Sequence, residues 1–241
     1  MQTIPAAFAA AVRRDPTLPL LTWYDDATGD RTELSGTTVD NWVAKTANLL
    51  VDGVGLGPGD SVAVLLPPHW QTAVILLGAW TAGLAVDLGP DPRPVEVFFS
   101  TPERAEAAPS WSTDDRYATG LLPLAAPLRQ VPAGFVDYTV EVRAHGDRFV
   151  SAGPVEANDR ALAGPVEESH LEVCETAAAR AAELGIKPGD RILVDAAGYP
   201  DAADWLLAPL VAGASIVLCG NLDPATIESR AQSERVTLRL T

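Results

Sequence analysis

The chain has 241 residues, 47% of them apolar, which is enough to bury a core in one large domain or two small ones. Its 17 basic residues are scattered and stand against 32 acidic ones, giving a formal charge of −15. Because binding to nucleic acid needs a concentrated cationic face, the composition argues against a nucleic-acid partner.

The sequence predicts no targeting or membrane-spanning segment. The most apolar stretch, residues 72–88, is interrupted by glycine, threonine and aspartate and divides into a helix and a strand. At the start of the chain, an apolar segment precedes two arginines, the reverse of the order in a secretory signal. Cys174 and Cys219 lie far apart, which is typical of buried thiols in a reduced compartment. We therefore expect a cytoplasmic protein that needs no membrane.

The first part of the chain alternates helix and strand. The predicted elements are a helix over 37–53, a strand at 61–67, a helix over 69–83 and a strand at 84–88. Thr37 or Thr38 is expected to cap the first helix, and Gly53 to end it. This order is typical of layered α/β domains with mainly parallel sheets.

The middle of the chain is irregular, and the last part is regular again. In the middle, strands are predicted at 95–99 and 137–146, and His145, Gly146 and Asp147 are predicted to form a hairpin turn. The elements predicted for the last part are a helix over 169–185 with the capping-box pair Ser169 and Glu172, a strand at 191–196, a helix over 201–213, a strand at 214–219, a helix over 224–234 capped by Asp223, and a strand at 235–240.

Four glycines at every second position, in the stretch GVGLGPGDSVAVLLP at 53–67, raise the question of a phosphate loop. Phosphate loops follow a strand and open a helix, because the backbone N–H groups at a helix start face the anion. These glycines follow a helix and precede a strand instead. Pro58 and Gly59 suit the centre of a type II turn, so the stretch is interpreted as a helix end and a tight turn.

A similar stretch, ELGIKPGDRILVDAA, is found at 183–197. An offset of 130 residues carries Pro58-Gly59-Asp60 onto Pro188-Gly189-Asp190 and Gly83 onto Gly213. Two copies of one helix–turn–strand–helix–strand unit are the simplest explanation. We expect a single domain with lobe one at about 1–94, an irregular bridge at about 95–157 and lobe two at about 158–241, and a ligand cleft between the lobes.

The two copies resemble the amino-terminal region of adenylate-forming ligases, the superfamily of acyl-CoA synthetases and adenylation domains. The run ELSGTTVDNWVAKTANLLVDGVGLGPGDSVAVLLPPHWQTAVILLGAWTAG is similar to their helix, Gly-x-x-Pro-Gly-Asp turn, strand, Pro-rich turn and helix ending in Ala-Gly. LGIKPGDRILVDAA with LLAPLVAGASIVLCG resembles their second subdomain. The resemblance covers about 33–90 and 165–241 and implies an α/β fold of two related lobes with mainly parallel sheets.

The chain departs from this family where the chemistry of the ligases lies. Their Ser/Thr/Gly-rich loop, which ends in Pro-Lys-Gly and wraps the ATP phosphates, precedes a Ser-His that matches Ser169-His170 here. In this chain NDRALAGPVEE precedes Ser169 instead. Gly164 and Pro165 are then the remnant of a degenerate phosphate loop. The nearby acidic residues would repel a triphosphate.

The rest of the ligase chemistry has no counterpart either. Neither lysine, Lys45 or Lys187, matches the catalytic lysine of the family, which belongs to a small carboxy-terminal domain, and the motifs for adenine, ribose and magnesium are missing. We therefore expect no catalytic residue, no metal site and no cofactor. ATP or AMP and Mg²⁺ belong only to the enzymatic alternative. The PPHW turn and the HGDRF segment (145–149) are similar to those of a small group of ligase-like bacterial proteins.

The candidate ligand-binding residues are His69, Trp70 and Tyr199. His69 and Trp70 follow a predicted strand at the edge where α/β sheets place ligands, and the 130-residue offset sets Tyr199 opposite His69, near where the resemblance implies the acyl group. Alternatively, His69 only starts a helix and Tyr199 only packs. His170 is expected to be structural, and so is the turn that contains His145.

Three functions are compatible with these features. The preferred one is a non-catalytic relative of the ligases that binds a small acyl-type or nucleotide-like ligand, or a protein partner, at the inter-lobe cleft. The alternatives are an ATP-dependent acyl-adenylate-forming ligase that needs a partner chain, and a structural or interaction protein with no ligand. A homodimer is expected, because apolar surface that the ligases bury against their other parts would be exposed here.

Overall fold

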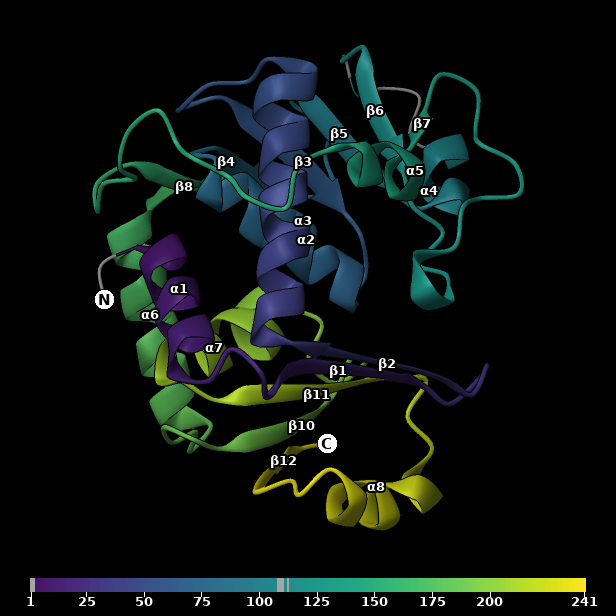
Figure 1. Cartoon of the computed structure of the whole chain (residues 1–241), viewed down its shortest axis with the longest axis vertical. Helices are drawn as coiled ribbons and strands as arrows, with labels where there is room; N and C mark the ends of the chain where they lie inside the picture. The colour runs from purple at the N-terminus through teal and green to yellow at the C-terminus, as the bar shows by residue number, and fades with distance from the viewer. Residues whose placement is uncertain (1–2, 108–110, 112) are drawn as a thin grey trace. The chain divides into compact units, whose positions relative to one another are not determined.

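The computed structural model of the chain describes residues 3–107, 111 and 113–241 (Figure 1). Its backbone divides into two compact units. Unit 1 comprises Met1–Asp40, Pro67–Ala73 and Glu172–Thr241, and unit 2 comprises Asn41–Leu66 and Val74–Leu171. Each unit is assembled from separate stretches of chain, whereas the lobes predicted from the repeated stretch are continuous in sequence.

Unit 2 contains a seven-stranded sheet in the order β7-β6-β5-β3-β4-β8-β9. Neighbouring strands are parallel, except that β8 and β9 are antiparallel. The strands are β3 (Ser61–Leu65), β4 (Ala85–Asp87), β5 (Val97–Ser100), β6 (Asp115–Ala118), β7 (Val136–Asp137), β8 (Arg160–Ala163) and β9 (Glu168–Ser169). β4 and β5 are buried along their whole length, as expected for parallel strands covered on both faces.

Unit 1 contains a five-stranded sheet in the order β12-β10-β11-β1-β2, in which only β1 and β2 are antiparallel to each other. The strands are β1 (Pro19–Asp25), β2 (Asp30–Ser35), β10 (Arg191–Asp195), β11 (Ser215–Gly220) and β12 (Leu238–Leu240). Figure 1 shows β11 between β1, from the start of the chain, and β10, from its last third. The predicted α/β class with mainly parallel sheets is confirmed.

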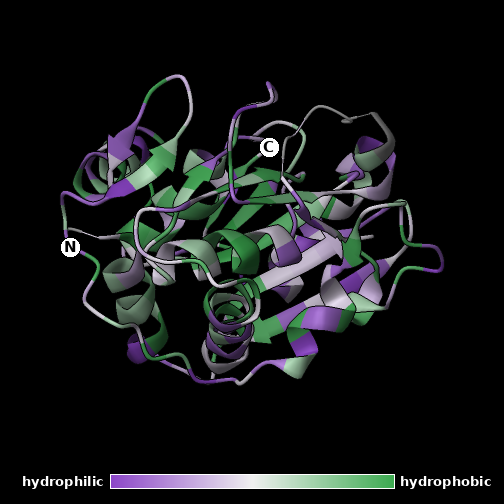
Figure 2. Ribbon diagram, turned by 90° about the horizontal axis from the view of Figure 1, so that it is seen from above, coloured by the Kyte–Doolittle hydropathy of each residue, from purple (hydrophilic) through white to green (hydrophobic). Residues whose placement is uncertain are grey.

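The helices of the described residues connect these strands. They are α1 (Ile4–Arg14), α2 (Gly36–Asn48), α3 (Trp70–Thr81), α4 (Pro102–Ala107), α5 (Tyr138–Glu141), α6 (His170–Glu183), α7 (Ala208–Ala212) and α8 (Ile227–Ser233). In Figure 2 the strands are mostly hydrophobic, whereas hydrophilic residues are concentrated in loops and on parts of the helices. Among the described residues, no helix combines the length and the apolar character that a membrane crossing requires.

The two Pro-Gly-Asp turns make the same backbone hydrogen bonds. The N–H of Asp60 donates to Gly57 O, and that of Asp190 donates to Lys187 O, both at 3.1 Å. Gly59 and Gly189 have φ of 93° and 85°, values that favour glycine. Their N–H groups donate at 3.0 Å to the carbonyls of two further glycines, 83 and 213, which lie after the following helices. The interpretation of the glycine-rich stretch as a turn therefore agrees with its geometry.

The predicted strand at 137–146 is wrong. Only Val136–Asp137 is extended, and the chain continues as α5 and then as a 3₁₀ turn over Val142–Ala144. The Asp137 carboxylate accepts the backbone N–H of Thr139 at 2.8 Å, so a local cap overrides the β-branched residues after it. The hairpin turn predicted at His145 is wrong too, because no strand flanks it within the described residues.

The ends of α2 differ from the prediction by two residues. The Ser35 Oγ, rather than Thr37 or Thr38, caps the helix start, because it accepts the Thr38 N–H at 3.2 Å. At the other end the helix continues as a π-helix over Leu49–Val54 and stops at Gly55, whose φ is 92°. Gly53 therefore lies inside the last turn.

The helix predicted over 201–213 consists of two parts. Ala203–Leu207 forms a π-helix, and α7 comes next with Pro209 at its second position. Proline offers no N–H to the preceding turn, which widens instead of closing as an α-helix.

Candidate functional site

The sequence that precedes Ser169 folds into a tight hairpin of unit 2. β8 runs parallel to β4, with Asp87 paired with Ala163, and the chain returns through residues 164–167 into β9. α6 begins at His170, directly after β9. The predicted remnant of a phosphate loop, Gly164 and Pro165, therefore lies at a hairpin tip beside the end of β4.

A buried carboxylate lies against this hairpin tip. Asp87 is 1% exposed, its Oδ1 accepts the Gly89 N–H at 2.7 Å, and its Oδ2 is 3.1 Å from a guanidinium nitrogen of Arg93. Gly164 has φ of 146°, and a Cβ at this position would lie 3.3 Å from the Asp87 carboxylate. Both the backbone angle and the close approach favour glycine here, and the group that it approaches is an internal anion.

The residues around the hairpin carry more negative than positive charge. Five carboxylates stand against two guanidiniums in this region, namely Asp87, Glu156, Asp159, Glu167 and Glu168 against Arg93 and Arg160. Arg160 is 2.6 Å from Glu167 and donates to the carbonyl of Gly59 at 2.8 Å. Since Arg93 is paired with Asp87, both cations already have an acidic partner. A triphosphate placed here would meet uncompensated carboxylates.

Ser169 and His170 form the junction between β9 and α6. His170 is completely buried, and its backbone N–H donates to the Asp159 carbonyl at 3.0 Å. Burial lowers the pKa of its imidazole to about 4, although the charge of Asp159 opposes the shift. The ring is therefore neutral at pH 7. This environment suits the structural role expected for His170, which stays a prediction.

His69 lies in unit 1, packed on an aromatic ring that the sequence did not single out. The centroids of the His69 and Trp23 rings are 4.5 Å apart. The two ring planes meet at 70°, in an edge-to-face arrangement. Its Nδ1 accepts the Gln71 N–H at 3.1 Å, so the proton of the neutral ring is on Nε2. Burial lowers the pKa of His69 to about 3, against the charge of Asp25. His69 is therefore a neutral imidazole whose Nε2–H is a hydrogen-bond donor.

The other two candidate ligand residues have different environments. Trp70 is 2% exposed, begins α3 and lies 5.7 Å from the His69 ring. Tyr199 is half-buried in the turn after β10, where its N–H donates to the Asp195 carbonyl at 3.0 Å. Within the described part of the chain, no hydrogen bond or ring contact joins Tyr199 to His69. The structure thus brings together His69, Trp70 and Trp23.

Two features of these sites were missed in the sequence. Asp87 ends an otherwise apolar strand, and Arg93 comes after it in a proline-rich turn. The signal in the sequence was therefore a single acidic residue in the apolar run LAVDL. Trp23 gave no signal, because an aromatic residue in a strand is ordinarily core. Among the described residues, no cluster of His, Cys, Asp and Glu is placed to hold a metal ion.

A family model described as AMP-binding enzyme matches residues 8–88 of this chain. The fatty acyl CoA synthetase of Mycobacterium tuberculosis superposes with a TM-score of 0.69 at 15% identity, over 99% of this chain and 49% of that one. The acyl-CoA synthetase of Brucella canis superposes with a TM-score of 0.72 at 18% identity, over 96% of this chain and 46% of that one. This chain thus spans about half the length of the two synthetases, and the likeness shows the fold of their amino-terminal part.

A relative from Mycobacterium tuberculosis (strain ATCC 25618 / H37Rv), the TIGR03089 family protein, is 41% identical over 250 residues, which cover 98% of both chains. The chain belongs to the TIGR03089 family. It has the fold of the amino-terminal region of the adenylate-forming ligases, as the resemblance implied.

Proposed function

We propose that this TIGR03089 family chain is a non-catalytic relative of the adenylate-forming ligases that binds a small acyl-type ligand beside His69. The non-catalytic role is argued from one observation, the buried Asp87 carboxylate at the hairpin tip, beside Gly164. In adenylyl transfer, cations and backbone donors stabilise the negative charge of the phosphates. The Asp87 carboxylate supplies neither, and it occupies Arg93 and the Gly89 N–H, which are a cation and a backbone donor of this region.

The ligand class is argued from the chemistry of His69. A neutral imidazole with a protonated Nε2 can donate to the carbonyl or carboxylate oxygen of an acyl group. The Trp23 and Trp70 rings next to it, 9% and 2% exposed, are apolar groups against which the carbon chain would pack. A nucleotide phosphate would instead require a cation, and His69 is uncharged at pH 7 because its pKa is about 3.

Two substitutions of His69 separate its nitrogen atoms. His69→Asn keeps an acceptor near Nδ1 for the Gln71 N–H and removes the donor at the Nε2 position, whereas His69→Gln places a donor near Nε2 and removes the acceptor. Titration calorimetry with a panel of fatty acids and acyl-CoAs should show binding that His69→Asn weakens by about tenfold or more and His69→Gln largely keeps. Equal affinities in both variants, or no binding by the wild type, would refute the proposed ligand site.

The enzymatic alternative is tested with the same panel of acids. Exchange of labelled pyrophosphate into ATP, with Mg²⁺ present, should stay at the background level for every acid. Turnover with any of them would show that the chain forms acyl-adenylates, alone or with a partner chain that is added to the assay. A third function, that of a structural protein without ligand, is favoured if both the binding and the exchange assays are silent.

A further inference from the structure

Unit 1 contains a groove that neither candidate site uses. Two hollows, of about 160 and 400 Å³, share Leu18, Pro19, Gly189 and Ser215 in their walls, so they adjoin each other, and we name them together the amino-end groove. The larger hollow has the size of a small-molecule site.

The amino-end groove and His69 lie at opposite ends of the same sheet. The groove lies where parallel strands β10 and β11 begin, at Arg191 and Ser215. Trp23, on which His69 packs, pairs with Leu218 toward the carboxyl end of β11. A ligand in the groove would therefore not touch the His69 position.

The larger hollow has an excess of positive charge. Three arginines and two glutamates line it, namely Arg31, Arg191, Arg235, Glu33 and Glu234. Glu234 lies 2.9 Å from Arg31 and 2.5 Å from Arg191, and Arg31 also contacts Glu33 at 2.5 Å. Within the described part of the chain, Arg235 has no acidic partner. It is an uncompensated cation on a chain whose formal charge is −15.

Arg235 is also held in an unfavourable backbone conformation. It lies just after α8 with φ of 55°, and the N–H of Val236 donates to Ala231 O at 2.8 Å, the bond that defines a Schellman helix end. Glycine occupies the corresponding left-handed position after α3, α6 and α7. An arginine in this place costs stability that a glycine would not, and backbone strain of this kind is concentrated at functional sites.

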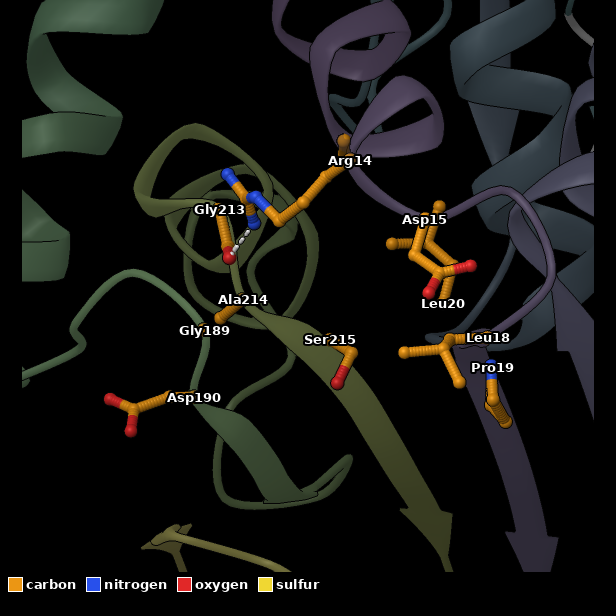
Figure 3. A pocket seen from close by; sticks show the side chains of 11 residues that line it. Arg14, Asp15, Leu18, Pro19, Leu20, Gly189, Asp190, Gly213, Ala214 and Ser215 are labelled. Carbon is orange, nitrogen blue, oxygen red and sulfur yellow. Dashed lines mark hydrogen bonds between the residues drawn. The ribbon is translucent and has the colours of Figure 1, made fainter.

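The smaller hollow adds apolar surface beside the larger one, and the charged residues in its wall are Arg14, Asp15 and Asp190. Figure 3 shows Leu18 and Pro19, at the start of β1, across from Gly213 and Ala214, with Arg14 donating to the Gly213 carbonyl. Leu18 is 59% exposed, so its side chain is accessible to a ligand in the groove. The groove therefore has an unpaired guanidinium at one end and an exposed aliphatic wall in its middle.

We propose that the amino-end groove binds an amphipathic organic anion, whose head pairs with Arg235 in the larger hollow and whose apolar part lies over Leu18 and Pro19. The guanidinium supplies a charge-assisted, planar donor for a carboxylate or phosphate head. The strain at Arg235 is the stability that the chain gives up to keep this donor.

The test uses a variant that is expected to be more stable than the wild type. Arg235→Gly relieves the strain and should raise Tm. In the His69→Asn background, which removes the site proposed beside His69, it should weaken the binding of octanoate in titration calorimetry by about tenfold or more. Asn221→Gly is the matched control, because Asn221 also has a positive φ, 49°, but does not line the groove. This control should leave the affinity for octanoate unchanged.

Further ligands and one more variant complete the test. Octylammonium, with the opposite charge, should not bind, and acetate, which has only the head, should bind at least about tenfold more weakly than octanoate. His69→Asn should not change the part of octanoate binding that Arg235→Gly removes. The experiment therefore distinguishes failure of the ligand site proposed beside His69 from failure of the amino-end groove. Octanoate binding in the His69→Asn background that Arg235→Gly leaves intact, an unchanged Tm in Arg235→Gly, or equal binding of acetate would overturn the proposal.

Discussion

The two segments that contain the Pro-Gly-Asp turns, residues 57–88 and 187–218, share their backbone hydrogen bonds and differ in the helices and strands after the turn. α3 is one continuous buried helix, whereas its counterpart is a π-helix followed by α7. Asp87, at the end of β4, corresponds by the 130-residue offset to Val217, which is completely buried in the middle of β11. One segment therefore has a buried acid where the other has an aliphatic core residue.

This difference shows which part of the segment determines chemistry. The turn depends on proline and glycine backbone angles and on one aspartate, so it repeats wherever those three residues repeat. The strand after the turn can contain either an apolar residue or a polar residue that has a buried partner. In unit 2 that residue is Asp87, which pairs with Arg93 and places a carboxylate beside Gly164.

The largest expected effect comes from removing the acid that distinguishes the two segments. Asp87→Ala leaves the Arg93 guanidinium and the Gly89 N–H without their acceptor, and should lower the free energy of unfolding by about 2–3 kcal/mol, the range for a pair whose cation is partly exposed. Val217→Ala, in the other segment, should cost about 1–2 kcal/mol by leaving a cavity. Both values are measured by urea denaturation.

The double variant tests whether the pair itself is responsible. Arg93→Met in the Asp87→Ala background removes the unpaired cation, so the double variant should be less destabilised than the sum of the two single variants. Additive effects would mean that Asp87 and Arg93 do not interact.

A second prediction compares the buried histidines, one in each unit. Folding lowers the pKa of His69 to about 3 and that of His170 to about 4, below the unfolded value of 6.5. Their neutral forms are favoured in the folded state, so this stability is complete above pH 6.5 and is lost as the pH falls toward the folded pKa values. From pH 7 to pH 5 each histidine should lower the free energy of unfolding by about 2 kcal/mol.

The measurement is urea denaturation of the wild type and of His69→Asn and His170→Asn at pH 7 and pH 5. Each variant should lose about half of the pH dependence in this range. A wild-type slope in both variants would show that other groups cause it.

The smallest expected effect tests the equivalence of the turns. Gly59→Ala and Gly189→Ala introduce a Cβ that meets nothing within 4 Å at either position, so the only cost is the positive φ. Each should lower the free energy of unfolding by about 1–2 kcal/mol, and the two values should agree closely. Clearly unequal costs would show that the two turns are held by different interactions.

Much of this fold could be predicted from the sequence, because its strands are apolar runs and its turns have strong glycine and proline signals. The strands β3, β4, β5, β10, β11 and β12 lie where they were predicted. The segment 137–146 could not be predicted, because a single capping aspartate outweighed several β-branched residues. The start of α2 was displaced for a similar reason, since Ser35 competed with two threonines for the same N–H groups.

The candidate site could be predicted only in outline. The absence of lysine and the acidic character of NDRALAGPVEE pointed to a degenerate phosphate loop at Gly164 and Pro165. The pairing of Asp87 with Arg93 beside Gly164 could not be seen, because it depends on which strand lies next to β8. The contact between His69 and Trp23 likewise joins residues far apart in the chain.

Titration calorimetry of the wild type with Mg·ATP tests whether the hairpin beside Asp87 holds a triphosphate. We expect no saturable binding at millimolar ATP. Saturable binding of one Mg·ATP per chain, weakened by substitutions at Gly164 or Arg160, would contradict this expectation.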